Sequence, residues 1–146
     1  MQVTIREIDA DNFVEAIRLD VKPEQKRFVA SNAASIAQSK FHTFLECYGL
    51  YDEETMVGFS AFGKNPEDDT IWIARHMIGA EYQGKGYGTA GLQALIDHME
   101  SEYECDAIFL DVGPENVAAI KLYESAGFVD TGRIQGKSKV YRLDLE

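Results

Sequence analysis

The segment from Thr70 to Val112 changes its hydrophobic period once, and this change constrains the fold more strongly than any other feature. Its first part, residues 70–78, is rich in β-branched and aromatic residues and predicts a strand. Apolar residues then recur at helical spacing, which predicts a helix over about 86–102 through Leu92, Leu95, Ile96 and Met99. The near-continuous apolar run 107–112 predicts a second, buried strand. This order predicts a β-α-β crossover inside a mixed α/β domain.

Shorter elements are predicted on both sides of this crossover. Before it we expect a strand at 2–8, a helix over 13–17 opened by a capping box of Asn12 and Glu15, a helix over 23–38 that begins at Pro23, and a hairpin of strands 43–51 and 56–63. After it we expect a helix over 114–126 ended by Gly127 as a left-handed cap, and then strands at 128–134 and 138–145.

The length and charge of the chain limit the partners that we expect. With 146 residues, one domain spanning 1–146 is expected, because two halves would each bury a poor core. The 14 Lys and Arg residues are outnumbered by 25 Asp and Glu residues, and the resulting net charge of −11 argues against nucleic acid as a partner. The same charge attracts cations, although it also serves solubility. No apolar stretch reaches the ~18 residues of a membrane helix, so no membrane partner is expected.

The cysteines and histidines predict neither a disulfide nor a metal site. Cys47 and Cys105 are far apart in the sequence and form no CxxC pair, which predicts reduced thiols and a cytoplasmic protein. His42, His76 and His98 are scattered without metal-ligand spacing, so we expect no metal.

The most informative motif is the glycine-rich turn between the predicted strand and helix, Gln83-Gly84-Lys85-Gly86-Tyr87-Gly88-Thr89. Glycines allow a tight turn in which several N–H groups point into one concavity. The helix that follows adds its positive N-terminal end. This combination is typical of a site for a phosphate or a pyrophosphate.

Two known phosphate motifs overlap this turn, but both are incomplete. Residues 86–91 fit the dinucleotide fingerprint G-x-G-x-x-G with Asp111 further on, yet only 35 residues follow Asp111, too few for the second half of such a fold. Residues 79–85 fit G-x-x-x-x-G-K, but Gly86 stands where that motif has the Ser or Thr that holds magnesium. We interpret both as chance overlaps on one phosphate-binding turn.

Two signatures resemble those of the GNAT superfamily of N-acetyltransferases. Gln83-x-x-Gly86-x-Gly88 is similar to the acetyl-CoA signature Q/R-x-x-G-x-G/A, and residues 116–128 are similar to the second signature, N-x-x-A-x-x-L-Y-x-x-x-G-F. The resemblance covers the whole chain. It implies a single GNAT domain, with a central, mostly antiparallel sheet that is splayed between strands 70–78 and 106–112 and flanked by helices. Residues 21–25, 28–32 and 82–88 further resemble bacterial spermine/spermidine acetyltransferases.

The resemblance also implies a site for acetyl-CoA as cosubstrate. Its residues would be Met77, Ile78, Gln83, Gly84, Lys85, Gly86, Tyr87, Gly88, Thr89 and Asn116. The end of the strand would pair with the pantetheine arm, and the N–H groups of the turn would cradle the pyrophosphate. The side chains of Gln83 and Lys85 would lie along the phosphates, and Asn116 would bond to the pantetheine. From the residues alone, Lys85 also fits a solvated position and Asn116 a helix start.

Tyr123 is the implied catalytic acid, which protonates the thiolate of coenzyme A as it leaves. A phenol suits this role because its pKa of about 10 keeps it protonated at neutral pH. Packing in the core is the alternative, since Tyr123 shares a helix face with Ala119 and Ile120.

The general base is not identified by the resemblance. Some polyamine acetyltransferases have a Glu nine positions before the Q/R residue, but Ala74 stands there in this chain. Glu46, His76 and Asp111 are the alternatives. A strand histidine such as His76 more often has a structural role.

The resemblance implies an acetyl-CoA-dependent N-acetyltransferase, and together with the net charge of −11 it favours a primary amine of a polyamine as the acceptor. We expect direct attack by the amine, because no positioned cysteine nucleophile is evident. The region of Asp20 and Glu24 is where relatives place the wall that faces the amine. An aminoglycoside, another small amine or a protein N-terminus is an alternative acceptor. A non-catalytic acyl-CoA-sensing module is an alternative function, and a homodimer is open as the assembly.

Overall fold

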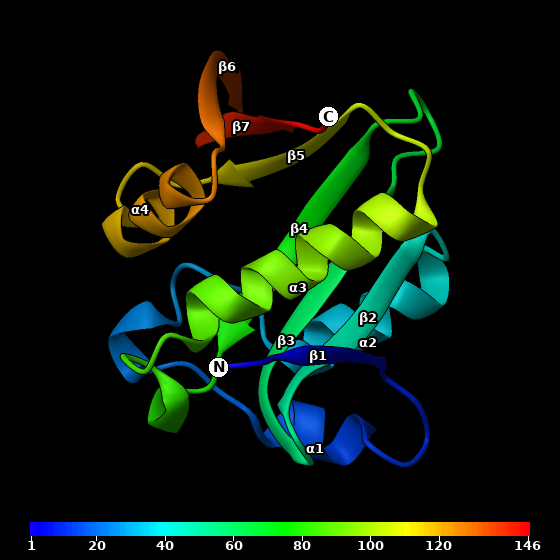
Figure 1. Cartoon of the computed structure of the whole chain (residues 1–146), viewed down its shortest axis with the longest axis vertical. Coiled ribbons are helices and arrows are strands. Elements are labelled where there is room, and N and C mark those ends of the chain that lie inside the picture. The colour runs from blue at the N-terminus through cyan, green and yellow to red at the C-terminus, as the bar shows by residue number, and fades with distance from the viewer.

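Seven strands form one sheet in the order β1-β2-β3-β4-β5-β7-β6, and the computed structural model describes all residues 1–146 (Figure 1). The strands are β1 (Thr4–Glu7), β2 (Leu45–Asp52), β3 (Thr55–Lys64), β4 (Ile71–Ile78), β5 (Ala107–Val112), β6 (Val129–Gln135) and β7 (Ser138–Asp144). The helices are α1 (Phe13–Arg18), α2 (Asn32–Phe41), α3 (Tyr87–Glu102) and α4 (Val117–Ser125), with short 3-10 turns η1 (Pro23–Gln25) and η2 (Ala80–Tyr82).

Strands β4 and β5 pair with each other only over their first residues. Ile71 pairs with Ile108 and Trp72 with Phe109, and no further pair follows. This is the only parallel pairing, as the predicted crossover through α3 requires. Beyond it, β4 stays with β3 while β5 stays with β7, and the two strands diverge (Figure 1). The predicted mostly antiparallel sheet with one splay is confirmed.

A β-bulge in β4 lies just beyond the last paired residues. Ala61 of β3 pairs with Arg75 and Phe62 pairs with Ile73, so Ala74 is the extra residue. A bulge bends its strand and changes which side chains face each side of the sheet. The bulge therefore separates the part of β4 that pairs with β5 from the part that borders the splay.

The helices cover both faces of the sheet, with α3 and α4 on one face and α1 and α2 on the other (Figure 1). The larger core contains the apolar stripe of α3, formed by Leu92, Leu95, Ile96 and Met99, together with side chains from β3, β4, β5 and β7. Complete burial of each of these side chains stabilises the fold by about 1.5–3 kcal/mol. This packing fixes α3 across β4, so its first turn lies at the end of that strand.

The end of α4 is held by a glycine cap, as predicted. Gly127 has a φ of 104°, and the N–H of Phe128 donates to the carbonyl oxygen of Tyr123 at 3.0 Å. The ring of Phe128 packs edge-on against that of Tyr123, with 5.8 Å between their centroids. The cap therefore fixes the position of the Tyr123 ring.

Three local predictions are wrong. The helix expected over 23–38 is instead η1 followed by α2, which begins at Asn32 because Ser31 caps it by accepting from the Ala34 N–H at 3.1 Å. Asn12 makes no capping box, since its side chain is bonded to Asp9 and Glu7 on the preceding segment.

The helix expected over 114–126 starts only at Val117, because Asn116 is its N-cap. None of the helices combines the length and the apolar character that crossing a membrane requires.

Candidate active site

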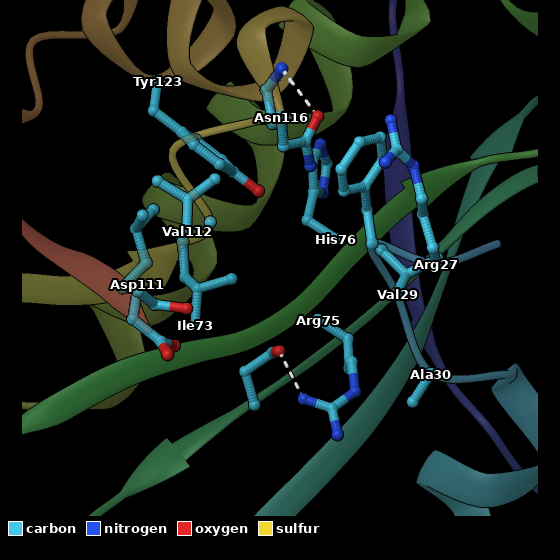
Figure 2. Close-up of a pocket in the computed structure, with 16 residues that line it drawn as sticks. Arg27, Val29, Ala30, Ile73, Arg75, His76, Asp111, Val112, Asn116 and Tyr123 are labelled. Atoms are coloured by element: carbon cyan, nitrogen blue, oxygen red, sulfur yellow. Dashed lines mark hydrogen bonds between the residues drawn. The ribbon is translucent and has the colours of Figure 1, made fainter. Parts of the chain in front are cut away.

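The splay between β4 and β5 contains a cavity of about 300 Å³. Its walls come from β4, β5, the start of α4 and the segment before α2, and they include Arg27, Phe28, Ala74, Arg75, Asp111, Asn116 and Tyr123. Figure 2 shows the Tyr123 hydroxyl and the Asn116 side chain directed into this space. We call it the splay cavity.

A second cavity of about 210 Å³ adjoins the first and extends along the end of β4 to the glycine turn. It is lined by Gln25, Met77, Ile78, Gln83, Gly84, Gly88 and Leu122, among others. Both cavities share Phe28, Val29, His76, Asn116 and Ala119. We call the second cavity the turn groove. The two together form one path from the glycine turn into the splay.

The glycine turn presents a row of unpaired backbone donors. None of the N–H groups from Gly84 to Thr89 has a hydrogen-bond acceptor, and the first bond of α3 runs from the Ala90 N–H to the Gly86 carbonyl. Gly84 and Gly86 have φ values of 76° and 92°, a backbone conformation that residues other than glycine rarely adopt. A helix start with free N–H groups is a favourable anion site, so the geometry suits the predicted pyrophosphate.

The side chains of the turn differ in how far contacts within the protein already engage them. The Gln83 amide does not lie free along the turn, because it bonds to Gln25 and donates to the Ile78 carbonyl at 2.9 Å. The Tyr87 hydroxyl donates to Asp52, so its ring packs toward the β2–β3 hairpin. Lys85 is exposed and has no partner, which leaves its ammonium available to a phosphate.

Met77 and Ile78 line the turn groove at the end of β4. Only 7% of Met77 is exposed, so its side chain offers little surface to a ligand. The Ile78 carbonyl already accepts from Gln83 at 2.9 Å, which leaves one lone pair of this oxygen for a further donor.

Asn116 combines the two roles that the sequence leaves open. Its side-chain oxygen accepts from the Ala119 N–H at 3.4 Å and caps α4; this is the dashed bond beside the Asn116 label in Figure 2. Its side-chain NH₂ group has no acceptor within the protein, and Asn116 lines both cavities. The cap fixes the side chain, and the NH₂ remains free to donate to a ligand.

Tyr123 is part of the core and of the splay cavity. Its ring packs against Phe128, and only 8% of the residue is exposed. Burial raises the pKa of Tyr123 to about 12, and the nearby charge of Asp111 contributes to this rise. Because its pKa is raised, the hydroxyl stays protonated at neutral pH. It makes no hydrogen bond within the protein, so it is free to donate to a ligand.

His76 is held in place by two contacts. Its Nδ1 lies 2.9 Å from the Ser60 hydroxyl, and its Nε2 lies 3.3 Å from the Gly88 carbonyl. Because a carbonyl can only accept, Nε2 carries the proton and Nδ1 accepts from Ser60. Burial also lowers the pKa of His76 to about 4. With both nitrogens occupied, His76 ties β4 to the start of α3 and is poorly suited to act as a base.

The two carboxylate alternatives differ in position. Glu46 accepts from the Tyr103 hydroxyl beneath the far end of α3 and lines neither cavity. Asp111 is the only carboxylate that lines the splay cavity, and it has no hydrogen bond or ion pair. Ala74, at the position of the missing glutamate, is a small wall residue of the same cavity.

Sequence reasoning missed two arginines in the splay cavity. Arg75 donates to the Ala74 carbonyl at 2.7 Å, and its buried Nε has no partner. Arg27 stacks on Phe28 and lies 3.5 Å from Glu115 at the surface. Of the predicted amine-facing wall, Asp20 pairs with Lys26 beside a neighbouring cavity, and Glu24 lines neither of the two cavities. The bulge at Ala74 sets the position of Arg75, and no signal in the sequence marks this bulge.

This arrangement suits a long ligand with an anionic end and a reactive end. The turn offers free N–H groups, the turn groove is largely apolar, and the splay cavity contains one phenol and one carboxylate. The structure holds no group of three His, Cys, Asp or Glu side chains that could bind a metal ion.

The chain is similar to known acetyltransferases. Residues 4–128 match the family model described as "Acetyltransferase (GNAT) family". The chain is 33% identical over 140 residues to the spermine/spermidine N(1)-acetyltransferase of Bacillus subtilis (strain 168), and the match covers 92% of each chain.

Solved structures share the fold at lower identity. A spermidine N-acetyltransferase from Vibrio cholerae, in complex with CoA and spermine, is 21% identical with a TM-score of 0.74, and the match covers 97% of this chain and 93% of the other. AAC(6')-Ib in complex with ribostamycin and coenzyme A is 17% identical with a TM-score of 0.81, covering 99% and 94%. Proteins with different ligands thus share this architecture.

Proposed function

Because the chain belongs to the GNAT acetyltransferase family and is therefore an N-acetyltransferase that uses acetyl-CoA, we propose that its acceptor is a small polyamine such as spermine or spermidine. The observation that carries this proposal is the 33% identity to the Bacillus subtilis spermine/spermidine enzyme over 92% of both chains. The net charge of −11 favours a cationic acceptor as well. The unpaired thiols of Cys47 and Cys105 are compatible with the reducing cytoplasm as the compartment.

The cosubstrate binds along the path formed by the two cavities. The free N–H groups of Gly84 to Thr89 hold the pyrophosphate, with Lys85 beside it. The pantetheine arm lies in the turn groove along Met77 and Ile78, and the free NH₂ of Asn116 donates to it. The thioester then reaches the splay cavity.

Transfer proceeds by direct attack of the amine on the thioester carbonyl carbon. The ammonium first loses a proton to Asp111, the only carboxylate in the splay cavity, directly or through one water. The new C–N bond forms and the C–S bond breaks. The leaving thiolate takes the proton of the Tyr123 hydroxyl, which regains a proton from solvent. The raised pKa of Tyr123 keeps this proton in place until the thiolate develops.

Arg75 favours a second candidate acceptor. Its guanidinium lines the splay cavity and has no carboxylate partner, and its buried Nε is unpaired. A guanidinium repels a second ammonium group, but it donates hydrogen bonds to a carbonyl or carboxylate oxygen. A protein N-terminus, with a peptide carbonyl next to the amine, satisfies this group better than a polyamine does.

Thiol release with an amine panel tests the proposal. The protein is incubated with acetyl-CoA and spermine, spermidine, putrescine, an aminoglycoside or an N-terminal peptide, and free CoA is followed over time. We expect kcat/KM to be highest for spermine and spermidine. Selective turnover of the peptide would instead favour the acceptor that Arg75 suits. If none of the amines caused release of CoA, the protein would be a module that binds acyl-CoA without transferring the acetyl group.

A further inference from the structure

Two glutamines that are far apart in the sequence form a reciprocal pair beside the glycine turn. Gln25 Nε2 donates to Gln83 Oε1 at 3.0 Å, and Gln83 Nε2 donates to Gln25 Oε1 at 2.9 Å. Both side chains are half-buried and line the turn groove next to Gly84. The pair therefore joins the segment before α2 to the turn that begins α3.

The outer contacts of the pair fix the orientation of both amides. Gln25 Oε1 also accepts from the Lys22 N–H at 3.0 Å, and an N–H can only donate. Gln83 Nε2 also donates to the Ile78 carbonyl at 2.9 Å, and a carbonyl can only accept. Neither amide can be reversed without losing one of these bonds. The result is a continuous network from the start of η1 to the end of β4.

The segment that Gln25 anchors forms a wall of both cavities. Residues 23–30 contribute Gln25, Phe28 and Val29 to the turn groove, and Arg27, Phe28, Val29 and Ala30 to the splay cavity. The only other side-chain polar link from this segment across the groove is the exposed Arg27–Glu115 pair at 3.5 Å, and exposed pairs contribute little. The glutamine pair is thus the main polar connection between this wall and the turn.

We propose that Gln25 is a positioning residue of the acetyl-CoA site, which acts through Gln83. Gln25 holds the Gln83 side chain against the Ile78 carbonyl. This fixes Gln83, which directly precedes the free N–H groups of Gly84 to Thr89. It also keeps Phe28 and Val29 over the groove in which the pantetheine lies, and in this respect the inference rests on the proposed cofactor path. Gln25 touches no reacting atom, so it sets cofactor affinity and leaves the chemical step unchanged.

A double-mutant cycle tests this inference with CoA binding as the readout. Gln25→Met and Gln83→Met remove the amides at similar length, singly and together, and calorimetry measures the affinity for CoA. We expect each single variant to bind CoA roughly tenfold more weakly, the order expected for losing one or two neutral hydrogen bonds. The double variant should bind no more weakly than Gln83→Met alone, since Gln25 acts through Gln83.

Kinetics and a matched control separate positioning from general damage. In Gln25→Met, KM for acetyl-CoA should rise by the same factor, while kcat at saturation should stay within twofold. Gln93→Met removes a glutamine whose amide bonds to Asp97 at 2.9 Å on the exposed side of α3, and it should leave CoA affinity unchanged. Thermal unfolding of every variant shows that the fold is retained.

Three outcomes would overturn the inference: unchanged CoA affinity in Gln25→Met, losses that simply add in the double variant, or a fall in kcat without a change in KM. Calorimetry with CoA needs no acceptor. If no polyamine is acetylated while the cycle is non-additive, the proposed acceptor fails and the role of Gln25 stands.

Discussion

Tyr123 and Asp111 line one cavity from the two faces of the sheet. Leu110 and Val112 of β5 are buried in the core with α3 and α4, where Tyr123 also packs, so the alternation of the strand turns Asp111 to the opposite face. Because β4 diverges from β5, the sheet is open between these two strands, and both Tyr123 and Asp111 reach the cavity there. In the proposed mechanism, Tyr123 as the acid and Asp111 as the base therefore approach the thioester from opposite faces of the sheet.

Tyr123→Phe is expected to lower kcat by roughly 10²–10⁴ and to leave the affinity for CoA nearly unchanged. The ring still packs against Phe128, and only the proton donor is lost. Steady-state kinetics and calorimetry with CoA measure the two quantities. Tyr141→Phe is the control, because Tyr141 is buried in the same core but lines neither cavity. An unchanged kcat in Tyr123→Phe would return this residue to a packing role.

Asp111→Asn is expected to lower kcat about 10²-fold or more, because the amide cannot take the proton of the ammonium. The activity of the variant should recover as the pH is raised toward the pKa of the amine, where the substrate arrives deprotonated. A pH profile of kcat/KM from pH 7 to 10 tests this recovery. Asp97→Asn, on the exposed side of α3, should follow the parent profile. Equal profiles for Asp111→Asn and the parent would exclude Asp111 as the base.

Gly86→Glu is expected to weaken CoA binding by at least tenfold. The substitution places a side chain at a φ of 92° and a negative charge among the N–H groups that hold the pyrophosphate. Gly132→Glu in β6 supplies a matched control, since the φ of Gly132 is 80°, a Cβ there would meet nothing within 4 Å, and Gly132 lines neither cavity. If both variants retained the parent's affinity for CoA, the assignment of the turn would be wrong.

His76 is expected to make the fold sensitive to acid. Its pKa is about 4 in the folded protein and about 6.5 when unfolded, so the unfolded chain binds more protons between these values. The contribution of His76 is complete above pH 6.5 and is lost as the pH falls toward 4. Urea unfolding of the parent and His76→Gln at pH 7 and pH 5 measures this loss. The difference in stability between the two proteins should shrink at pH 5, whereas His42→Gln, at an exposed position, should track the parent.

The sequence was most informative where the signal is local. The tight turn at Gly84 and Gly86, the glycine cap at Gly127 and the helical spacing of α3 each depend on neighbouring residues, and all of them were predictable. The crossover followed from the order of these elements, because a parallel pair joined by a helix has few arrangements.

Features that depend on distant partners were not predictable. The segment 26–30 has a composition that favours a helix, yet it runs as a wall of the cavities between η1 and the Ser31 cap. The orientation of Gln83 is set by Gln25, far away in the chain, and the position of Arg75 is set by the bulge at Ala74. Tertiary packing decides all three.

The most direct test is a competition in one vessel. Equal concentrations of spermine, spermidine, an aminoglycoside and an N-terminal peptide share a limited amount of acetyl-CoA, and mass spectrometry identifies the products, with Tyr123→Phe as the blank. Because the acceptors compete, the product ratio reports the ratio of their kcat/KM values. Monoacetylated spermine and spermidine as the main products would agree with the proposed function. An acetylated peptide or aminoglycoside, with both polyamines unmodified, would contradict it.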